Sequence, residues 1–166
     1  AENQGLRSAA YFFPGTEAEI AGRRPSIWEA YDGKVPNDER VDTVLSWFDL
    51  PVASRPRMIT MYFSNTDDAG HAYSPDSEEL KAAVARVDAG IARLVASLNA
   101  RKIGDKVNII IVSDHGMATV DQQNAVLMDN YFDFDLAARI LWTGEIVQVF
   151  PQEGKQAEIP SGLKKI

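Results

Sequence analysis

Ile109-Ile110-Ile111-Val112-Ser113-Asp114-His115-Gly116-Met117 is the stretch of this 166-residue chain that decides its fold. Four consecutive β-branched aliphatic residues are typical of a short strand that is buried on both faces of a sheet. A carboxylate, an imidazole and a glycine follow the run closely. Because open α/β sheets bind their ligands at the carboxyl ends of strands, this Asp-His pair is well placed for chemistry.

A long helix is predicted before this strand, from about residue 77 to residue 101. Its apolar residues recur at spacings of four and three and form one stripe: Leu80, Val84, Val87, Ile91, Leu94 and Leu98. An apolar segment at residues 57–63 precedes the helix and predicts another buried strand. Strand, helix and strand form a βαβ unit, which implies a parallel sheet with a right-handed crossover. We therefore expect an α/β fold with a mainly parallel sheet flanked by helices.

Local patterns also predict elements on either side of this unit. Residues 9–13 are a candidate short strand, and residues 37–48 are a candidate helix with one apolar face. Further along, residues 125–128 are a candidate strand, and residues 138–142 and 145–150 flank Thr143-Gly144 like a hairpin. Residues 151–166 lack periodicity, so we expect a frayed tail or a truncation point there.

Composition excludes several classes of protein. The formal net charge of −7 argues against a general nucleic-acid binder, which would carry a basic face. The absence of cysteine excludes disulfides and thiolate metal sites. We expect no membrane span in this segment, because no apolar run is long enough to cross a bilayer, and no signal peptide is visible.

A second aspartate–histidine pair, Asp67 and His71, follows the strand predicted at residues 57–63, and His71 and His115 are the only two histidines of the chain. Gly70 and Ser74-Pro75 favour a loop here. Parallel strands end at one sheet edge, so the two pairs are expected to meet. Carboxylate oxygens and imidazole nitrogens suit zinc, and two ions ~3.5–4 Å apart act on phosphoryl substrates. A purely structural, hydrogen-bonded role for each pair stays open on this evidence.

Six stretches together resemble the nucleotide pyrophosphatase/phosphodiesterase family of the alkaline phosphatase superfamily. They are Tyr11-Phe12-Phe13-Pro14-Gly15, Arg24-Pro25, Tyr31-Asp32-Gly33-Lys34-Val35-Pro36, Arg40-Val41-Asp42, Asp67-x-x-Gly70-His71 and Ser113-Asp114-His115-Gly116-Met117. The resemblance covers roughly residues 1–150 and implies that they form the central part of a phosphodiesterase catalytic domain. The implied fold is part of an alkaline phosphatase-like fold, with residues 151–166 as the tail or truncation point.

The resemblance implies a zinc-dependent hydrolase with a two-metal centre. Asp67 and His71 would bind one zinc ion, and Asp114 and His115 would bind the other. The family's nucleophile, an early aspartate and a last zinc-binding histidine match no residue of this chain. We therefore expect no catalytic nucleophile here, partial or empty zinc sites, and little or no activity of the chain alone.

The resemblance also implies a substrate site. Tyr62 matches an aromatic residue that stacks on a nucleotide base, and Tyr31 matches a tyrosine that lines the pocket. Composition alone would instead place Tyr62 in the hydrophobic core, with no role in binding a base. The implied partner is a small-molecule nucleotide or another phosphodiester, with no nucleic-acid polymer, and the implied location is periplasmic or extracellular.

Two other functions remain open from the sequence. One is another hydrolase or mutase of the same superfamily, such as a phosphomonoesterase or a phosphonate hydrolase. The other is a non-catalytic domain whose Asp-His pairs are structural.

Overall fold

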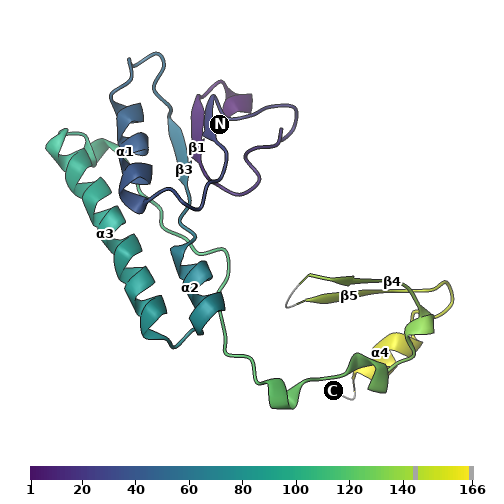
Figure 1. The fold of residues 1–166 in the computed structure, drawn as a ribbon. Helices are drawn as coiled ribbons and strands as arrows, with labels where there is room; N and C mark the ends of the chain where they lie inside the picture. Colours follow the sequence, from purple (N-terminus) through teal and green to yellow (C-terminus); the bar gives the residue numbers. More distant parts are fainter. Residues whose placement is uncertain (144–145, 165–166) are drawn as a thin grey trace. The chain divides into compact units, whose positions relative to one another are not determined.

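The computed structural model describes residues 1–143 and 146–164 and divides the chain into two compact units, with the boundary after Thr119. The first unit contains η1 (Glu2–Gln4), β1 (Ser8–Tyr11), β2 (Ile27–Glu29), α1 (Asn37–Phe48), β3 (Met58–Met61), α2 (Asn65–Tyr73), α3 (Glu78–Ala100) and η2 (Gly104–Lys106). The second unit contains η3 (Gln122–Asn124), η4 (Met128–Asn130), η5 (Phe134–Leu136), β4 (Ala137–Trp142), β5 (Val147–Pro151) and α4 (Glu158–Leu163). Figure 1 shows the helices and strands of each unit.

A three-stranded parallel sheet in the order β2-β1-β3 is the centre of the first unit. Ala9 of the middle strand lies opposite Ile27 on one side and Ile59 on the other. β1 is buried from Ala9 onward, as expected for the middle strand of a covered sheet. The strands predicted at residues 9–13 and 57–63 are present as β1 and β3, although β3 is not buried as predicted, since Met58 is 52% exposed and its other residues are half-buried. The α/β class with a parallel sheet flanked by helices is confirmed.

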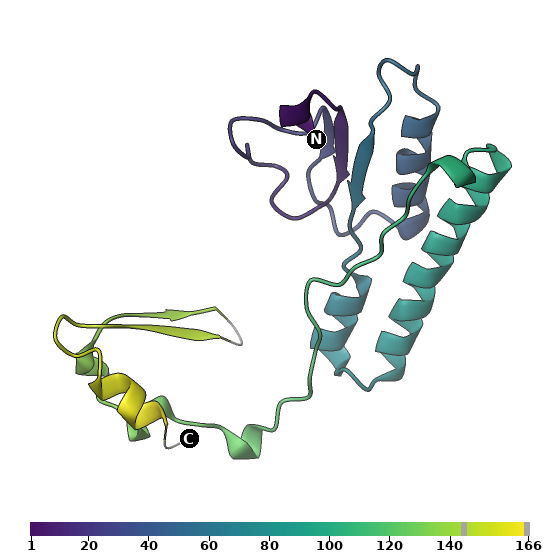
Figure 2. The same cartoon turned by 180° about the vertical axis from the view of Figure 1, so that it is seen from behind.

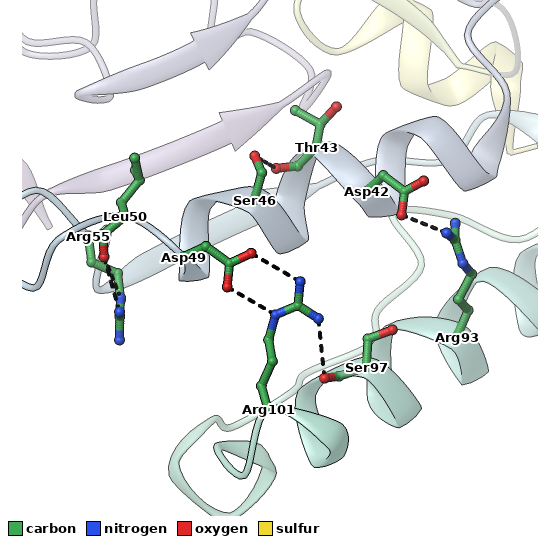
Figure 3. Close-up of polar contacts among 9 residues, drawn as sticks. All are labelled: Asp42, Thr43, Ser46, Asp49, Leu50, Arg55, Arg93, Ser97 and Arg101. Atoms are coloured by element: carbon green, nitrogen blue, oxygen red, sulfur yellow. Dashed lines mark hydrogen bonds and ion pairs between the residues drawn. The ribbon is translucent and has the colours of Figure 1, made fainter.

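Helices α1 and α3 are the two predicted amphipathic helices, and they lie side by side (Figure 1). Leu98 of α3 is 2% exposed and packs against Val41 and Leu45 of α1. Three ion pairs join the helices at their surface: Arg93 pairs with Asp38 and Asp42, and Arg101 pairs with Asp49. Figure 3 shows the pairs of Asp42 with Arg93 and of Asp49 with Arg101. These exposed pairs contribute little to stability, so the apolar contacts hold the helices together.

Residues 107–112 do not form the predicted strand, so the predicted βαβ unit is wrong. They run as an irregular coil after η2 (Figure 2). Ile110 and Val112 are 84% and 78% exposed, and only Val107 packs against the core. A β-branched run becomes a strand only where its backbone pairs with a neighbour. Within the described residues the sheet ends at β3 and makes no pairing with this run.

Residues 65–73 form helix α2, where the sequence predicted a loop. Asp67 and Asp68 lie in its first turn, where carboxylates interact favourably with the helix dipole. Gly70 lies inside this helix and costs about 1 kcal/mol relative to alanine, which a helix tolerates where a close contact requires it. The consequence for the site is that Asp67 and His71, four residues apart, share one helix face.

The second unit contains the predicted hairpin. β4 and β5 pair antiparallel, with Ile140 opposite Val149. The expected turn residue Gly144 lies outside the described residues. The strand predicted at residues 125–128 is wrong. Residues 125–127 are exposed and pair with no described strand, and Met128 begins the short helix η4. The expected tail contains α4, in which Ile159 is 2% exposed.

No described helix has the length and apolarity needed to cross a membrane.

Candidate active site

Both aspartate–histidine pairs lie at one place in the first unit. Asp67 and His71 come from α2, and Asp114 and His115 come from the coil that follows residue 112. Oδ1 of Asp67 is at the centre, 3.4 Å from Nε2 of His71 and 3.7 Å from Nε2 of His115. Oδ2 of Asp114 lies 3.8 Å from Nε2 of His115. The pairs meet as expected, although a helix and a coil bring them together where two strand ends were predicted to do so.

A contact between Gly70 and Met117 docks the second pair against α2. A Cβ atom on Gly70 would lie 2.3 Å from Sδ of Met117 and 2.9 Å from its Cε. Any other residue at position 70 would therefore displace the methionine side chain. Each motif supplies one partner of this contact, the glycine before His71 and the methionine two residues after His115. Sequence reasoning missed Met117, because its partner is distant in the chain.

The imidazole of His115 is oriented by its own backbone. Nδ1 of His115 lies 2.9 Å from the carbonyl oxygen of Gly116. Because a carbonyl can only accept a hydrogen bond, Nδ1 carries the proton in this contact, and Nε2 is the nitrogen that a metal ion could bind. The backbone N–H of His115 donates to Oδ1 of Asp114 at 3.1 Å. This arrangement turns Nε2 toward Asp67, and the metal-binding histidines of other proteins are commonly held in the same way.

The donor groups suit a divalent cation. Oδ1 of Asp67 is buried and accepts no hydrogen bond, because its contacts with the two imidazoles are too long or misaligned. A buried carboxylate oxygen without a donor is costly, and a bound cation would remove that cost. The carboxylate and imidazole donors are those that zinc prefers. Within residues 1–143 and 146–164, however, no three His, Cys, Asp or Glu side chains are arranged to hold a metal ion together.

The two predicted substrate tyrosines adjoin the same place. The rings of Tyr31 and Tyr62 meet edge to face, with centroids 6.1 Å apart. The hydroxyl of Tyr31 donates to Oγ of Ser64 at 2.8 Å. Burial raises the pKa of the Tyr62 hydroxyl, and the negative charges of Asp67 and Asp114 raise it further. Tyr31 remains 46% exposed, so part of its ring is open to a ligand.

Arg40 is a residue of this region to which sequence reasoning gave no role. It lies in α1 and is 1% exposed. A hydrogen bond to the carbonyl oxygen of Tyr62 and a cation–π contact with Tyr31 connect it to both tyrosines. One feature of the sequence could have indicated that Arg40 is buried: it lies one helical turn before Val44, on the apolar side of the helix.

Comparison with known proteins gives matches over most of the chain. The sequence model of the family described as type I phosphodiesterase / nucleotide pyrophosphatase matches residues 1–165. The venom phosphodiesterase CdcPDE of Crotalus durissus collilineatus is 41% identical over 130 residues, which are 78% of this chain and 16% of that protein. Human ectonucleotide pyrophosphatase/phosphodiesterase family member 1 is 37% identical over 131 residues, which are 79% of this chain and 14% of that protein.

Solved structures give a similar result. Murine ectonucleotide pyrophosphatase/phosphodiesterase 5 is similar over 98% of this chain and 43% of its own, with a TM-score of 0.80 and 27% identity. A further structure of that murine protein is an inactive variant in complex with AMP, with the same TM-score and identity. The human protein of the same name matches with a TM-score of 0.80 and 28% identity. The chain thus spans less than half the length of each of these proteins.

Proposed function

This chain belongs to the type I phosphodiesterase / nucleotide pyrophosphatase family, and we propose that it carries part of a zinc-dependent site that hydrolyses phosphodiester or pyrophosphate bonds. The observation that supports this proposal best is the buried, hydrogen-bond-free Oδ1 of Asp67 with His71 and His115 beside it. A carboxylate oxygen that has no hydrogen-bond donor leaves its negative charge poorly compensated, and a divalent cation would compensate it.

Each of the four residues has a role in this proposal. Asp67 and His71 hold one zinc ion, and Asp114 and His115 contribute to the second. Bound zinc supplies positive charge that stabilises the attacking and leaving oxygens of a phosphoryl group and lowers the pKa of bound water. The hydrogen bond from His115 to Gly116 keeps the imidazole in the tautomer that can bind metal. The contact between Gly70 and Met117 keeps the two pairs together.

The tyrosines supply the substrate-binding part of the site. In this proposal Tyr62 stacks on the nucleotide base, and Tyr31, which is half-exposed and meets Tyr62 edge to face, lines the pocket. A nucleotide substrate is also favoured by the relatives named as nucleotide pyrophosphatases and by the AMP complex of the murine protein. We propose a small nucleotide or related phosphodiester as the substrate, with no role for a nucleic-acid polymer, because the net charge is −7.

The activity is proposed for a longer protein. The chain spans only 16% of the venom phosphodiesterase that it matches, and no nucleophile has been identified among its residues. We propose that residues outside this chain supply the nucleophile and the remaining zinc ligands, so that the chain alone hydrolyses phosphodiesters weakly or not at all. An extracellular location is supported by relatives named as venom and ecto-enzymes.

Titration calorimetry with zinc tests the proposal on the chain itself. We expect zinc to bind, and we expect Asp67→Asn to weaken binding strongly, because it removes the carboxylate at the centre of the site. Asp105→Asn is the matched control, since Asp105 is exposed in η2 and lies in no predicted site. Zinc binding that is equally strong in the wild type, Asp67→Asn and Asp105→Asn would instead favour a structural role for the Asp-His pairs.

A further inference from the structure

Arg40 is the largest fully buried side chain among the described residues. Moving a charged group out of water is costly unless the group is paired and hydrogen-bonded. None of the ion pairs within residues 1–143 and 146–164 includes Arg40. Its charge is therefore compensated by groups other than a carboxylate.

The groups that compensate this charge are backbone carbonyls and aromatic rings. Nε of Arg40 donates to the carbonyl oxygen of Val35 at 3.0 Å, and a terminal nitrogen donates to the carbonyl oxygen of Tyr62 at 3.2 Å. The guanidinium carbon lies 5.1 Å from the ring centre of Phe12 and 6.0 Å from that of Tyr31. These distances are typical of cation–π contacts.

The contacts of Arg40 join segments that are far apart in the chain. Tyr31 lies in the loop after β2, and Tyr62 follows β3. Phe12, directly after β1, has a φ of 57°, a strained conformation for an aromatic residue, and its ring meets Tyr31 edge to face at 5.6 Å. Strained backbone of this kind is common at ligand-binding sites and persists only where the surroundings enforce it. Arg40 contacts all three residues and is the group best placed to enforce their arrangement.

We infer that Arg40 is a positioning residue that fixes the rings of Tyr31 and Tyr62 in the geometry needed to stack a nucleotide base. The inference rests on the proposed function, in which these tyrosines bind the base. A planar guanidinium can bond two carbonyls and stack on rings at the same time, whereas the single ammonium of lysine cannot. Arg40→Lys therefore keeps the charge and removes the positioning.

The first test measures ring geometry without any ligand. NMR of the chain with labelled tyrosines reports the contact between the rings of Tyr31 and Tyr62, and the contact between Tyr11 and Trp47 reports the intact core. We expect Arg40→Lys to abolish the first contact and retain the second. Arg101→Lys is the matched control, because Arg101 pairs with Asp49 on the α3 surface, and it should retain both. Retention of the tyrosine contact in Arg40→Lys would overturn the inference.

The second test measures base recognition. With zinc added, calorimetry compares AMP with ribose 5-phosphate, which lacks the base. We expect Arg40→Lys to bind AMP about tenfold more weakly, the scale of one lost base–aromatic stack, while its affinities for ribose 5-phosphate and zinc stay unchanged. An unchanged preference for AMP in Arg40→Lys would overturn the inference. If the wild type shows no preference for AMP, the proposed base site fails, and ring NMR still decides the role of Arg40.

A wild-type measurement covers the case in which Arg40→Lys does not fold. The Nε–H resonance of Arg40 reports directly on its environment. We expect this resonance to shift when AMP is added and to stay in place with ribose 5-phosphate. Equal responses to the two compounds would contradict the inference.

Discussion

Replacing Gly70 with alanine should disturb the assembly of the site while leaving the stability of the fold nearly unchanged. The new Cβ atom would lie 2.3 Å from Sδ of Met117, a distance that forces the methionine side chain away. Because the far end of a methionine is flexible, the clash is relieved by movement of Met117 and leaves α2 intact. The stretch that carries Asp114 and His115 then loses its contact with the helix that carries Asp67.

The energetic terms nearly cancel for folding. Alanine in a helix interior is favoured over glycine by about 1 kcal/mol. Displacing the half-buried Met117 costs roughly 1 kcal/mol, which is half of what full burial of such a side chain contributes. The free energy of unfolding should therefore change little. Zinc affinity should fall by about tenfold or more, the scale seen when groups that orient metal ligands are lost.

Gly90→Ala is the matched control in the neighbouring helix α3. A Cβ atom there would lie 3.8 Å from the ring of Phe63 and from Val41, which is ordinary contact. We expect this variant to gain about 1 kcal/mol in urea unfolding and to keep the zinc affinity of the wild type. Urea unfolding and competitive zinc titration of both variants provide the comparison. Equal zinc affinities in the two variants would refute the docking role of Gly70 and Met117.

Three further predictions concern the fold. Leu98→Ala should lower the free energy of unfolding in urea by about 2–5 kcal/mol, because Leu98 is 2% exposed in the core. Val95 is 38% exposed on the same helix, so Val95→Ala should cost clearly less, and equal losses would contradict the packing of Leu98. Ile110→Lys should change stability by only about 0.5 kcal/mol, because Ile110 is 84% exposed; a loss of several kcal/mol would show that the run is a buried strand after all. Hydrogen bonds from Ser8 and Ser26 lower the pKa of Glu2 from 4.5 to about 2. Its stabilising effect is therefore complete above pH 4.5 and is lost as the pH falls through about 2. The stability of Glu2→Gln should therefore not show the loss at low pH that protonation of Glu2 causes in the wild type. Identical acid unfolding of the two proteins would show that Glu2 makes no such contribution.

The sequence predicted those elements whose signal is local. Helix α3, the amphipathic α1 and the hairpin β4–β5 each follow from the spacing of nearby residues, and all three are present. One residue of the predicted apolar stripe of α3, Val84, is 52% exposed. The run Ile109–Val112 fails as a prediction, because strand formation depends on a neighbour that local sequence does not specify. Gly70 was interpreted as a loop residue, although its role is a close contact with Met117 inside a helix.

The candidate site, too, was predicted only in part from the sequence. Six short stretches were sufficient to predict the family and its alkaline phosphatase-like fold, and the comparisons confirm both. The proximity of Asp67 to His115 was also predicted, although from two parallel strand ends of which one is absent, while the roles of these residues stay predictions. Arg40 was missed, because a cation in an amphipathic helix is ordinarily solvent-facing, and its burial depends on carbonyls and rings from three other segments.

The central proposal is that the two aspartate–histidine pairs form part of a two-zinc centre that acts on phosphodiesters. The most direct test is the hydrolysis of a nitrophenyl phosphodiester by a full-length protein that contains this segment, with zinc content measured on the same samples. We predict that His71→Ala and His115→Ala each lose bound zinc and activity together, while Asp105→Asn retains both. Full activity and unchanged zinc content in either histidine variant would contradict the claim.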